Sequence, residues 1–367
     1  MTDPRLQRWA RTLVQYSVGV ASGDLLMITS TPAGAPLVKE VYREALKVGA
    51  HPHVVLGLPG LQEVLLAEAN EQQLSFVSPM DELVMNQFNA TLNILASENT
   101  RALANADPAK QAMLSKSRRG LTETFMRRQA TGDLKWSITL FPTNAYAQDA
   151  GMSLDDFSEF VYGACFLNEE DPVAHWKALA AEQQHLVDWL KGKESVHLIA
   201  KETDLRLSIK DRVFINGDGQ KNFPDGEFFT GPVEDSVNGH IRFSIPAMFQ
   251  GRPVEGVRLR FEQGKVVEST ADVGQELLDQ MLAMDEGASR LGEFAFGNNF
   301  GISRGIKNIL FDEKIGGSVH MALGAGYPDT GSVNHSALHW DMICDLRTGG
   351  EVRVDGQLFN KDGKFVV

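Results

Sequence analysis

Cysteine is scarce in this chain of 367 residues, which has only Cys165 and Cys344. Two cysteines cannot form the disulfide framework of a small secreted protein, and no Cys-x-x-Cys pair is present to hold a structural zinc ion. Both cysteines lie in apolar segments, so we expect buried and unreactive thiols. The sequence therefore gives no reason to place its chemistry on sulfur.

Long apolar runs are absent as well. No segment approaches the roughly 20 apolar residues that a membrane-spanning helix requires. The N-terminal segment MTDPRLQRWA is polar and lacks the apolar centre of a secretory signal. We therefore expect a soluble, cytoplasmic protein that binds no membrane.

Basic residues are outnumbered, with 35 Lys and Arg against 48 Asp and Glu, which gives a formal net charge of −13. Nucleic acids bind to basic surfaces, so we expect no nucleic-acid partner. A cation, or a substrate that carries a free amine, suits an acidic protein better.

Several common catalytic signatures are missing. The first half of the chain has neither Gly-x-Gly-x-x-Gly nor a P-loop, so a nucleotide site has no support there. No Gly-x-Ser-x-Gly elbow indicates a serine hydrolase, and no His-Glu-x-x-His motif indicates the common type of zinc protease.

The first half alternates helical and strand patterns. Apolar spacing predicts a helix over residues 36–50, with Leu37, Val41, Tyr42, Ala45 and Leu46 on one face. Short apolar runs predict strands over residues 22–30, 53–58, 90–97 and 135–141. This alternation predicts a largely parallel sheet flanked by helices, in an N-terminal α/β domain of residues 1–195.

After about residue 196 the pattern changes to short strands separated by Gly, Asn, Asp and Pro turns. One helix near residues 273–284 interrupts them. Residues 287–350 contain 12 of the 34 glycines, as expected where loops bring distant side chains together. We predict a strand-rich α+β domain over residues 196–367, which carries the metal site and catalysis.

The first candidate for that site is the pair His339 and Asp341. Residues two apart in a strand point to the same side, so both side chains would project from one face. An imidazole and a carboxylate side by side can share a divalent ion such as zinc or cobalt. An isolated His-x-Asp pair is weak evidence by itself.

Three further side chains lie beside glycines at the edges of apolar segments. Glu227 follows a Pro-Asp-Gly turn, Glu293 begins the run EFAFG, and His320 follows a glycine pair. Each of them alone is more simply explained as a surface carboxylate near a turn or a hydrogen-bonded core histidine. Together with the pair they give three carboxylates and two imidazoles, a suitable set for two adjacent divalent ions.

A family resemblance favours the metal site. The segments FPDGEFFTGP, LGEFAFGNNFGI, DEKIGGSVHMALG and NHSALHWDMICDL closely resemble peptidase family M29, the aminopeptidase T and aminopeptidase S group. The resemblance covers nearly the whole chain. It implies two divalent ions per subunit, of zinc, cobalt, manganese or magnesium. The metal ligands that it implies are Glu227, Glu293, His320, His339 and Asp341.

The same resemblance implies an activity and the remaining site residues. Tyr327, seven residues after His320, corresponds to a catalytic tyrosine, and Glu313 matches an acidic position that ligates metal or transfers protons. Either Glu293 or Glu313 would take the proton of the attacking water. The implied protein is a homodimeric metalloaminopeptidase, which hydrolyses the N-terminal bond of peptides that have a free N-terminus.

Two alternatives stay open. A non-haem iron oxygenase also uses two histidines and one carboxylate. Here, however, the lone histidine comes before the His-x-Asp pair, and the additional glutamates would have no role. The other alternative is a binding protein on the same fold without activity, although every site position of the family is filled.

Overall fold

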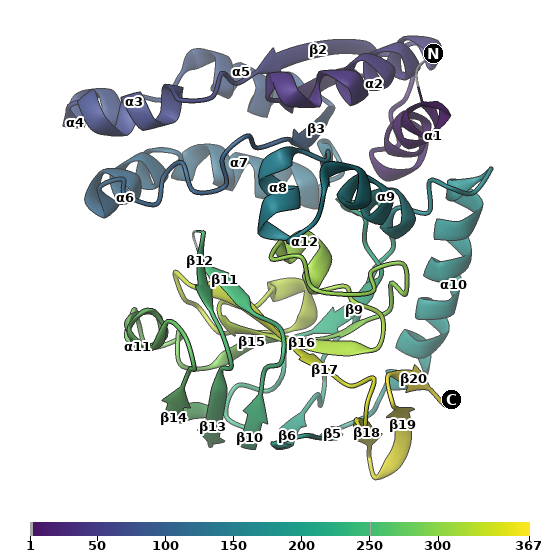
Figure 1. Cartoon of the computed structure of the whole chain (residues 1–367), viewed down its shortest axis with the longest axis vertical. Coiled ribbons are helices and arrows are strands. Elements are labelled where there is room, and N and C mark those ends of the chain that lie inside the picture. Colours follow the sequence, from purple (N-terminus) through teal and green to yellow (C-terminus); the bar gives the residue numbers. More distant parts are fainter. Residues whose placement is uncertain (1–2, 250) are drawn as a thin grey trace. The chain divides into compact units, whose positions relative to one another are not determined.

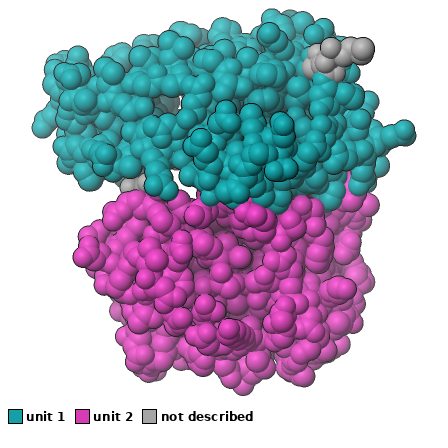
Figure 2. Space-filling view, in the orientation of Figure 1, with its two compact units in different colours: residues 1–174, 219–224 teal, residues 175–218, 225–367 magenta. Residues whose placement is uncertain are grey.

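The computed structural model describes residues 3–249 and 251–367. The chain divides into two compact units, coloured separately in Figure 2. Unit 1 comprises residues 1–174 and 219–224, and unit 2 comprises residues 175–218 and 225–367. A functional boundary between residues 195 and 196 stays a prediction. No helix of the described ranges is both long and apolar enough to cross a membrane.

Unit 1 is built on a five-stranded parallel sheet, as the alternating pattern predicts (Figure 1). Its apolar strand β1 lies between β2 and β3. Because these strands are parallel, the chain joins them by crossovers and not by hairpins. In spatial order the strands are β2 (His51–Leu56), β1 (Leu25–Ser30), β3 (Ala90–Leu95), β4 (Lys135–Leu140) and β8 (Asn222–Phe223).

Several helices of unit 1 start at residues whose side chains cap them. The side chain of Asp3 accepts a hydrogen bond from the N–H of Arg5 at the start of α1, and Ser153 does the same for Asp156 in α9. The helices are α1 (Pro4–Thr12), α2 (Ala35–Lys47), α3 (Leu61–Glu68), α4 (Glu71–Leu74), α5 (Pro79–Gln87), α6 (Pro108–Ser117), α7 (Arg119–Ala130), α8 (Asn144–Asp149) and α9 (Leu154–Ala164).

Unit 2 is strand-rich, and its larger sheet is antiparallel throughout. Its strands, in spatial order, are β14 (Lys265–Thr270), β13 (Arg258–Glu262), β10 (Asn238–Arg242), β6 (Thr203–Ser208), β5 (Ser195–Ala200), β18 (Glu351–Val354), β19 (Gln357–Lys361) and β20 (Lys364–Phe365). The α/β fold with a parallel sheet followed by a strand-rich part is therefore confirmed.

A second antiparallel sheet of unit 2 carries the residues of interest (Figure 1). Its strands, in spatial order, are β17 (His339–Asp345), β16 (Ser318–Gly324), β15 (Leu291–Gly297), β9 (Glu227–Thr230) and β7 (Ile215–Gly217). The other strands and α-helices of unit 2 are the hairpin of β11 (Ala247–Phe249) and β12 (Arg252–Val254), the helices α11 (Gln275–Leu282) and α12 (Ile309–Asp312), and most of α10 (Pro172–Leu190).

An aromatic core lies under one face of this second sheet. The ring centroid of Phe296 is 5.0 Å from that of Phe228 and 5.3 Å from that of Phe359, which belongs to the larger sheet. All three side chains are buried. Because side chains alternate along a strand, the core position of Phe296 and Phe294 leaves Glu293 for the opposite face. The core therefore fixes which face of β15 carries the polar residues.

Candidate metal centre

Five of the predicted site residues lie on one face of the second sheet. Glu227 begins β9, Glu293 lies on β15 and His320 lies on β16. His339 and Asp341 are two apart on β17, so both point to the same side of that strand. Their polar atoms approach one another across these strands, as the ion-pair distances show.

A glycine or an alanine stands opposite each of these side chains on a neighbouring strand. The pairs are Glu227–Gly297, Glu293–Ala322, His320–Ala295, His339–Gly324 and Asp341–Ala322. Directly opposed residues of two strands share one face of the sheet, so a large partner would occupy the space between the polar groups. The small partners let five polar side chains converge there.

A β-bulge brings Glu293 into the site. The register of β15 against β16 shifts between Leu291 and Glu293. A Cβ atom on the intervening Gly292 would lie 2.3 Å from the backbone oxygens of Gly324 and Ala325, so no larger residue fits. Bulges redirect a side chain locally, which is why they are common beside active sites.

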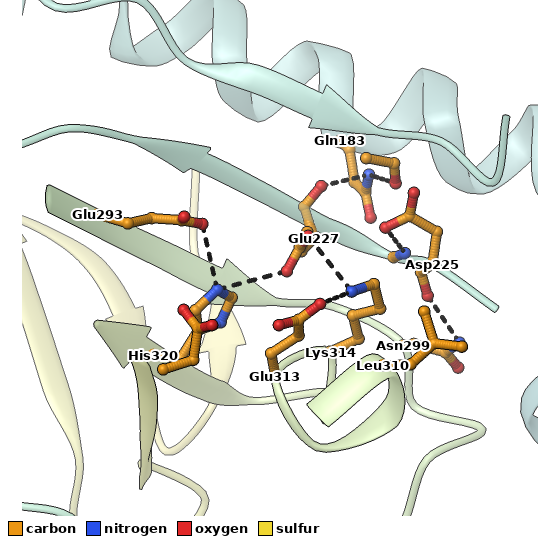
Figure 3. Close-up of polar contacts among 12 residues, drawn as sticks. Gln183, Asp225, Glu227, Glu293, Asn299, Leu310, Glu313, Lys314 and His320 are labelled. Atoms are coloured by element: carbon orange, nitrogen blue, oxygen red, sulfur yellow. Dashed lines mark hydrogen bonds and ion pairs between the residues drawn. The ribbon is translucent and has the colours of Figure 1, made fainter. Parts of the chain in front are cut away.

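Glu293 lies between the two histidines. Its Oε1 is 3.4 Å from Nε2 of His320, and its Oε2 is 3.5 Å from Nε2 of His339 (Figure 3 shows the first contact). His320 Nε2 is also 3.4 Å from Oε2 of Glu227, and His339 Nε2 is 3.5 Å from Oδ2 of Asp341. Each imidazole therefore faces two carboxylates.

The cluster is mostly buried. Glu227, Glu293, His320 and Asp341 are between 1% and 8% exposed, whereas the side chain of His339 is 30% exposed. Burial opposes ionisation of the imidazoles, but the hydrogen bond of His320 to Glu293 and the nearby carboxylate charges outweigh it. They raise the pKa of His320 to about 9. The site thus stabilises positive charge strongly.

The pKa shifts of the other site residues reflect both burial and the charges of their neighbours. Burial again opposes the charge of His339, but its contact with Asp341 and the charge of Glu293 raise its pKa to about 10. Burial raises the pKa of both Glu227 and Glu293. For Asp341, burial is outweighed by the hydrogen bond from His339, which lowers its pKa.

The residues present fit divalent metal ions. Glu293, His339 and Asp341 form one group of ligand atoms within 4.8 Å of one another, and Glu313, His320 and Asp341 form another. Within the described part of the chain, Oε2 of Glu227 and Oδ1 of Asp341 are buried and accept no hydrogen bond. A buried carboxylate oxygen without a donor is costly unless a cation compensates it. Carboxylate and imidazole donors suit zinc and related ions.

Comparison with known proteins agrees with the geometry. Residues 2–365 match the model of the thermophilic metalloprotease family M29. The chain belongs to this family. It is therefore a metallopeptidase, a hydrolase of peptides from a family that uses divalent metal.

Named relatives of this M29 chain are similar over most of their length. Aminopeptidase 2 of Geobacillus stearothermophilus is 27% identical over 99% of this chain and 95% of its own. Aminopeptidase T of Thermus thermophilus is 26% identical over 88% of this chain and 85% of its own. The solved structure of wild-type AmpT from Thermus thermophilus shares the fold, with a TM-score of 0.86, 24% identity and coverage of 99% of both chains.

Glu313 of the M29 chain lies at the end of α12, beside the cluster. Its neighbour Lys314 was not among the predicted site residues. The side chain of Lys314 is 0% exposed, and its ammonium forms ion pairs with Glu227 and Glu313 (Figure 3). Burial opposes this charge, but the attraction of both carboxylates outweighs it and raises the pKa of Lys314. Lys314 stands in an Asp-Glu-Lys run, which normally lies in solvent, so the local sequence carries no signal that identifies it.

Tyr327 of the M29 chain lies in the loop between β16 and β17. Its ring centroid is 5.4 Å from that of Phe229 and 5.3 Å from that of the His339 imidazole. Burial and the charges of Glu293 and Asp341 raise the pKa of its hydroxyl. Tyr327 therefore keeps its proton at neutral pH and can act as a hydrogen-bond donor. The residue as a whole is 45% exposed, so it borders the solvent-accessible side of the cluster.

An anchor that sequence patterns do not indicate holds this loop. Oε1 of Glu234 accepts a hydrogen bond of 2.7 Å from the backbone N–H of Val333 and one of 3.2 Å from Oγ of Ser332. Oε2 of Glu234 is 2.6 Å from a guanidinium nitrogen of Arg212. The Oγ1 of Thr330 donates a hydrogen bond of 2.6 Å to the backbone oxygen of Tyr327. The loop that carries Tyr327 is thus fixed at both its start and its middle.

Proposed function

We propose that this M29 metallopeptidase is an aminopeptidase, which removes N-terminal residues from peptides with the help of two divalent ions per subunit. The residues that would hold the ions are Glu227, Glu293, His320, His339 and Asp341. The observation that carries the proposal is the position of Glu293, with one carboxylate oxygen toward each histidine. One shared carboxylate between two imidazoles suits a pair of adjacent ions. The names of the relatives, aminopeptidase 2 and aminopeptidase T, support the exopeptidase activity.

The bound ions would supply Lewis acidity, which polarises a peptide carbonyl and lowers the pKa of water into the neutral range. The protein would supply the proton transfers. Glu293 or Glu313 accepts the proton of the attacking water and passes it to the leaving amine. The ion pair of Glu313 with Lys314 holds one carboxylate oxygen and leaves the other for this role. Which of the two glutamates acts stays a prediction.

Tyr327 would stabilise the tetrahedral intermediate. Its hydroxyl stays protonated, and its ring centroid lies 5.3 Å from that of the His339 imidazole. A hydrogen bond to the developing oxyanion strengthens as the negative charge grows, so it lowers the barrier more than it improves substrate binding. The acidic cluster, with four carboxylates close to two imidazoles, also suits the amine of a peptide N-terminus.

Family membership argues against the alternatives of an iron oxygenase and of a binding protein without activity. The homodimer and the cytoplasmic location implied by the family resemblance stay predictions, as do the physiological metal and the preferred N-terminal residue. Light scattering at micromolar protein concentration would test the dimer.

The proposal is tested by metal analysis of the purified protein, paired with hydrolysis of aminoacyl p-nitroanilides before and after chelation. We expect close to two ions per subunit after reconstitution, and activity that chelation abolishes and added zinc or cobalt restores. Turnover that survives complete removal of metal would contradict the proposal.

A further inference from the structure

A completely buried ammonium group lies against the proposed metal ligands. Lys314 follows α12, and its side chain is 0% exposed. Its Nζ is 3.5 Å from Oε1 of Glu227 and forms a second, closer ion pair with Oε1 of Glu313. Figure 3 shows the ammonium between these two carboxylates. An ionised amine is expensive to bury, so this position needs an explanation beyond packing.

The backbone around Lys314 is held in place on both sides. Its N–H donates to the carbonyl oxygen of Phe311 at 3.0 Å, and its own carbonyl accepts from the N–H of Asn299 at 3.0 Å. The side-chain amide of Asn299 donates to the carbonyl oxygen of Asp225, two residues before Glu227. Lys314 therefore extends from a fixed backbone that is tied to the same segment as its partner Glu227.

The two oxygens of Glu227 have different neighbours. Oε1 faces the ammonium of Lys314, whereas Oε2 faces Nε2 of His320 at 3.4 Å. Glu313 likewise gives Oε1 to Lys314, and Glu313 belongs to the group of possible ligands with His320 and Asp341. One cation thus contacts both carboxylates through Oε1, while Oε2 of Glu227 faces His320.

We propose that Lys314 is a positioning residue, which orients Glu227 and Glu313 so that their free oxygens face the metal and the reacting water. This inference rests on the proposed metal-dependent function. Lys314 touches neither substrate nor water in this account and acts through the two glutamates. Second-sphere partners of this kind set the orientation of metal ligands in many enzymes.

If Lys314 only balanced charge, its removal would change the metal affinity in the opposite direction to the one that a positioning role predicts. Removal of the ammonium takes away a positive charge that repels a bound cation, so pure charge balance predicts tighter metal binding without Lys314. Positioning predicts weaker binding, because Glu227 and Glu313 lose their common partner and their fixed orientation. The sign of the change in metal affinity therefore separates the two roles.

The test compares Lys314→Met with the wild type and with Arg347→Met, a matched control. Arg347 forms an ion pair of 2.6 Å with Asp345 in the same unit, outside the cluster. Zinc affinity is measured by competition with a chromophoric chelator, and folding is checked by circular dichroism. We expect Lys314→Met to bind zinc on the order of 10- to 100-fold more weakly, and Arg347→Met to bind it like the wild type.

A kinetic measurement at saturating zinc adds a second readout. A misplaced Glu313 lowers kcat for an aminoacyl p-nitroanilide, whereas KM stays close to the wild-type value, since Lys314 does not contact the substrate. Zinc binding by Lys314→Met as tight as the wild type, or tighter, would overturn the inference while leaving the proposed function intact. A wild-type protein that binds no zinc would overturn both.

A structure of the zinc-loaded wild type decides the matter if Lys314→Met does not fold. The inference requires that Nζ of Lys314 keep its contacts with Glu227 and Glu313 while other oxygens of these carboxylates face the metal. An ammonium displaced from both carboxylates in the zinc-loaded protein would contradict it.

Discussion

His339 and Asp341 stand two residues apart on β17, and Nε2 of His339 lies 3.5 Å from Oδ2 of Asp341. The alternation of side chains along a strand brings them to one face, as the His-x-Asp spacing predicts. Glu293 joins them from β15, so the pair becomes part of a group of three possible ligands. These two side chains are the pair of proposed metal ligands that the sequence spacing alone predicts.

Replacement of His339 tests whether this pair binds metal. We expect His339→Ala to abolish peptide hydrolysis and to reduce the metal content of the purified protein, because one imidazole of the proposed site is lost. The side chain is 30% exposed, so the fold should survive. His240→Ala, which removes an exposed histidine on β10 of the other sheet, is the control. Full activity and full metal content in His339→Ala would refute the site.

Tyr327 tests the proposed stabilisation of the oxyanion. Tyr327→Phe should lower kcat by about two to three orders of magnitude, the scale for loss of one oxyanion donor. Metal content should not change, because the phenol holds no ion in this account. Tyr42→Phe, in which an exposed tyrosine of α2 loses its hydroxyl, should behave like the wild type. Near-normal turnover of Tyr327→Phe would make its role structural only.

Glu234 gives a prediction for the pH dependence of stability. Burial opposes its ionisation, but the N–H of Val333 and the guanidinium of Arg212 outweigh this and lower the pKa of Glu234. A lowered carboxylate pKa contributes stability above the ordinary glutamate value of 4.5, and this contribution is lost as the pH falls through the lower folded value.

Glu234→Gln should therefore unfold more easily than the wild type at pH 7 and should lose less stability on acidification. Thermal unfolding between about pH 7 and pH 3 measures both effects. Glu268→Gln, at an exposed position paired with Arg260 on the larger sheet, is the comparison. Parallel stability curves for Glu234→Gln and the wild type would contradict the proposed ionic anchor.

Phe296 tests the packing of the aromatic core beneath the site. Phe296 is 1% exposed and packs against Phe228 and Phe359. Phe296→Ala should lower the free energy of unfolding by about 3–5 kcal/mol, the usual cost of deleting a buried phenyl ring. Phe300→Ala, at a position that is 57% exposed, should cost far less. Denaturant titration of both variants measures the difference, and equal losses would contradict the packing described.

Local sequence patterns predicted the positions of helices and strands better than they predicted which face of each is buried. The helix over residues 36–50 exists as α2, and Leu37, Val41 and Ala45 are buried as the apolar spacing suggests. Tyr42 and Leu46, however, are 40% and 54% exposed. At about 3.6 residues per turn, Leu46 points away from Leu37, so the predicted face was too wide.

The candidate site depends on contacts between distant strands, which residue spacing within one segment does not predict. The pair on β17 follows from alternation, but the order β17, β16, β15, β9 and β7 arises from pairing between strands far apart in the sequence. The bulge before Glu293 and the burial of Lys314 both depend on that pairing. Lys314 was missed because an Asp-Glu-Lys run normally lies in solvent, and nothing local shows that Asp312 and Lys314 are buried and that the side chain of Glu313 is only 14% exposed.

The most direct test of the account compares a free aminoacyl p-nitroanilide with its N-acetyl derivative, at identical zinc loading of the wild-type protein. An aminopeptidase must recognise the chain end, and acetylation removes both the charge of the amine and its ability to bind metal. Without the contact to the free amine, the scissile carbonyl is also oriented less well. Rate and affinity should therefore fall together. We predict hydrolysis of the free compound and none of the acetylated one. Comparable kcat/KM values for the two would show that the enzyme does not recognise the N-terminus, and would contradict the assignment as an aminopeptidase.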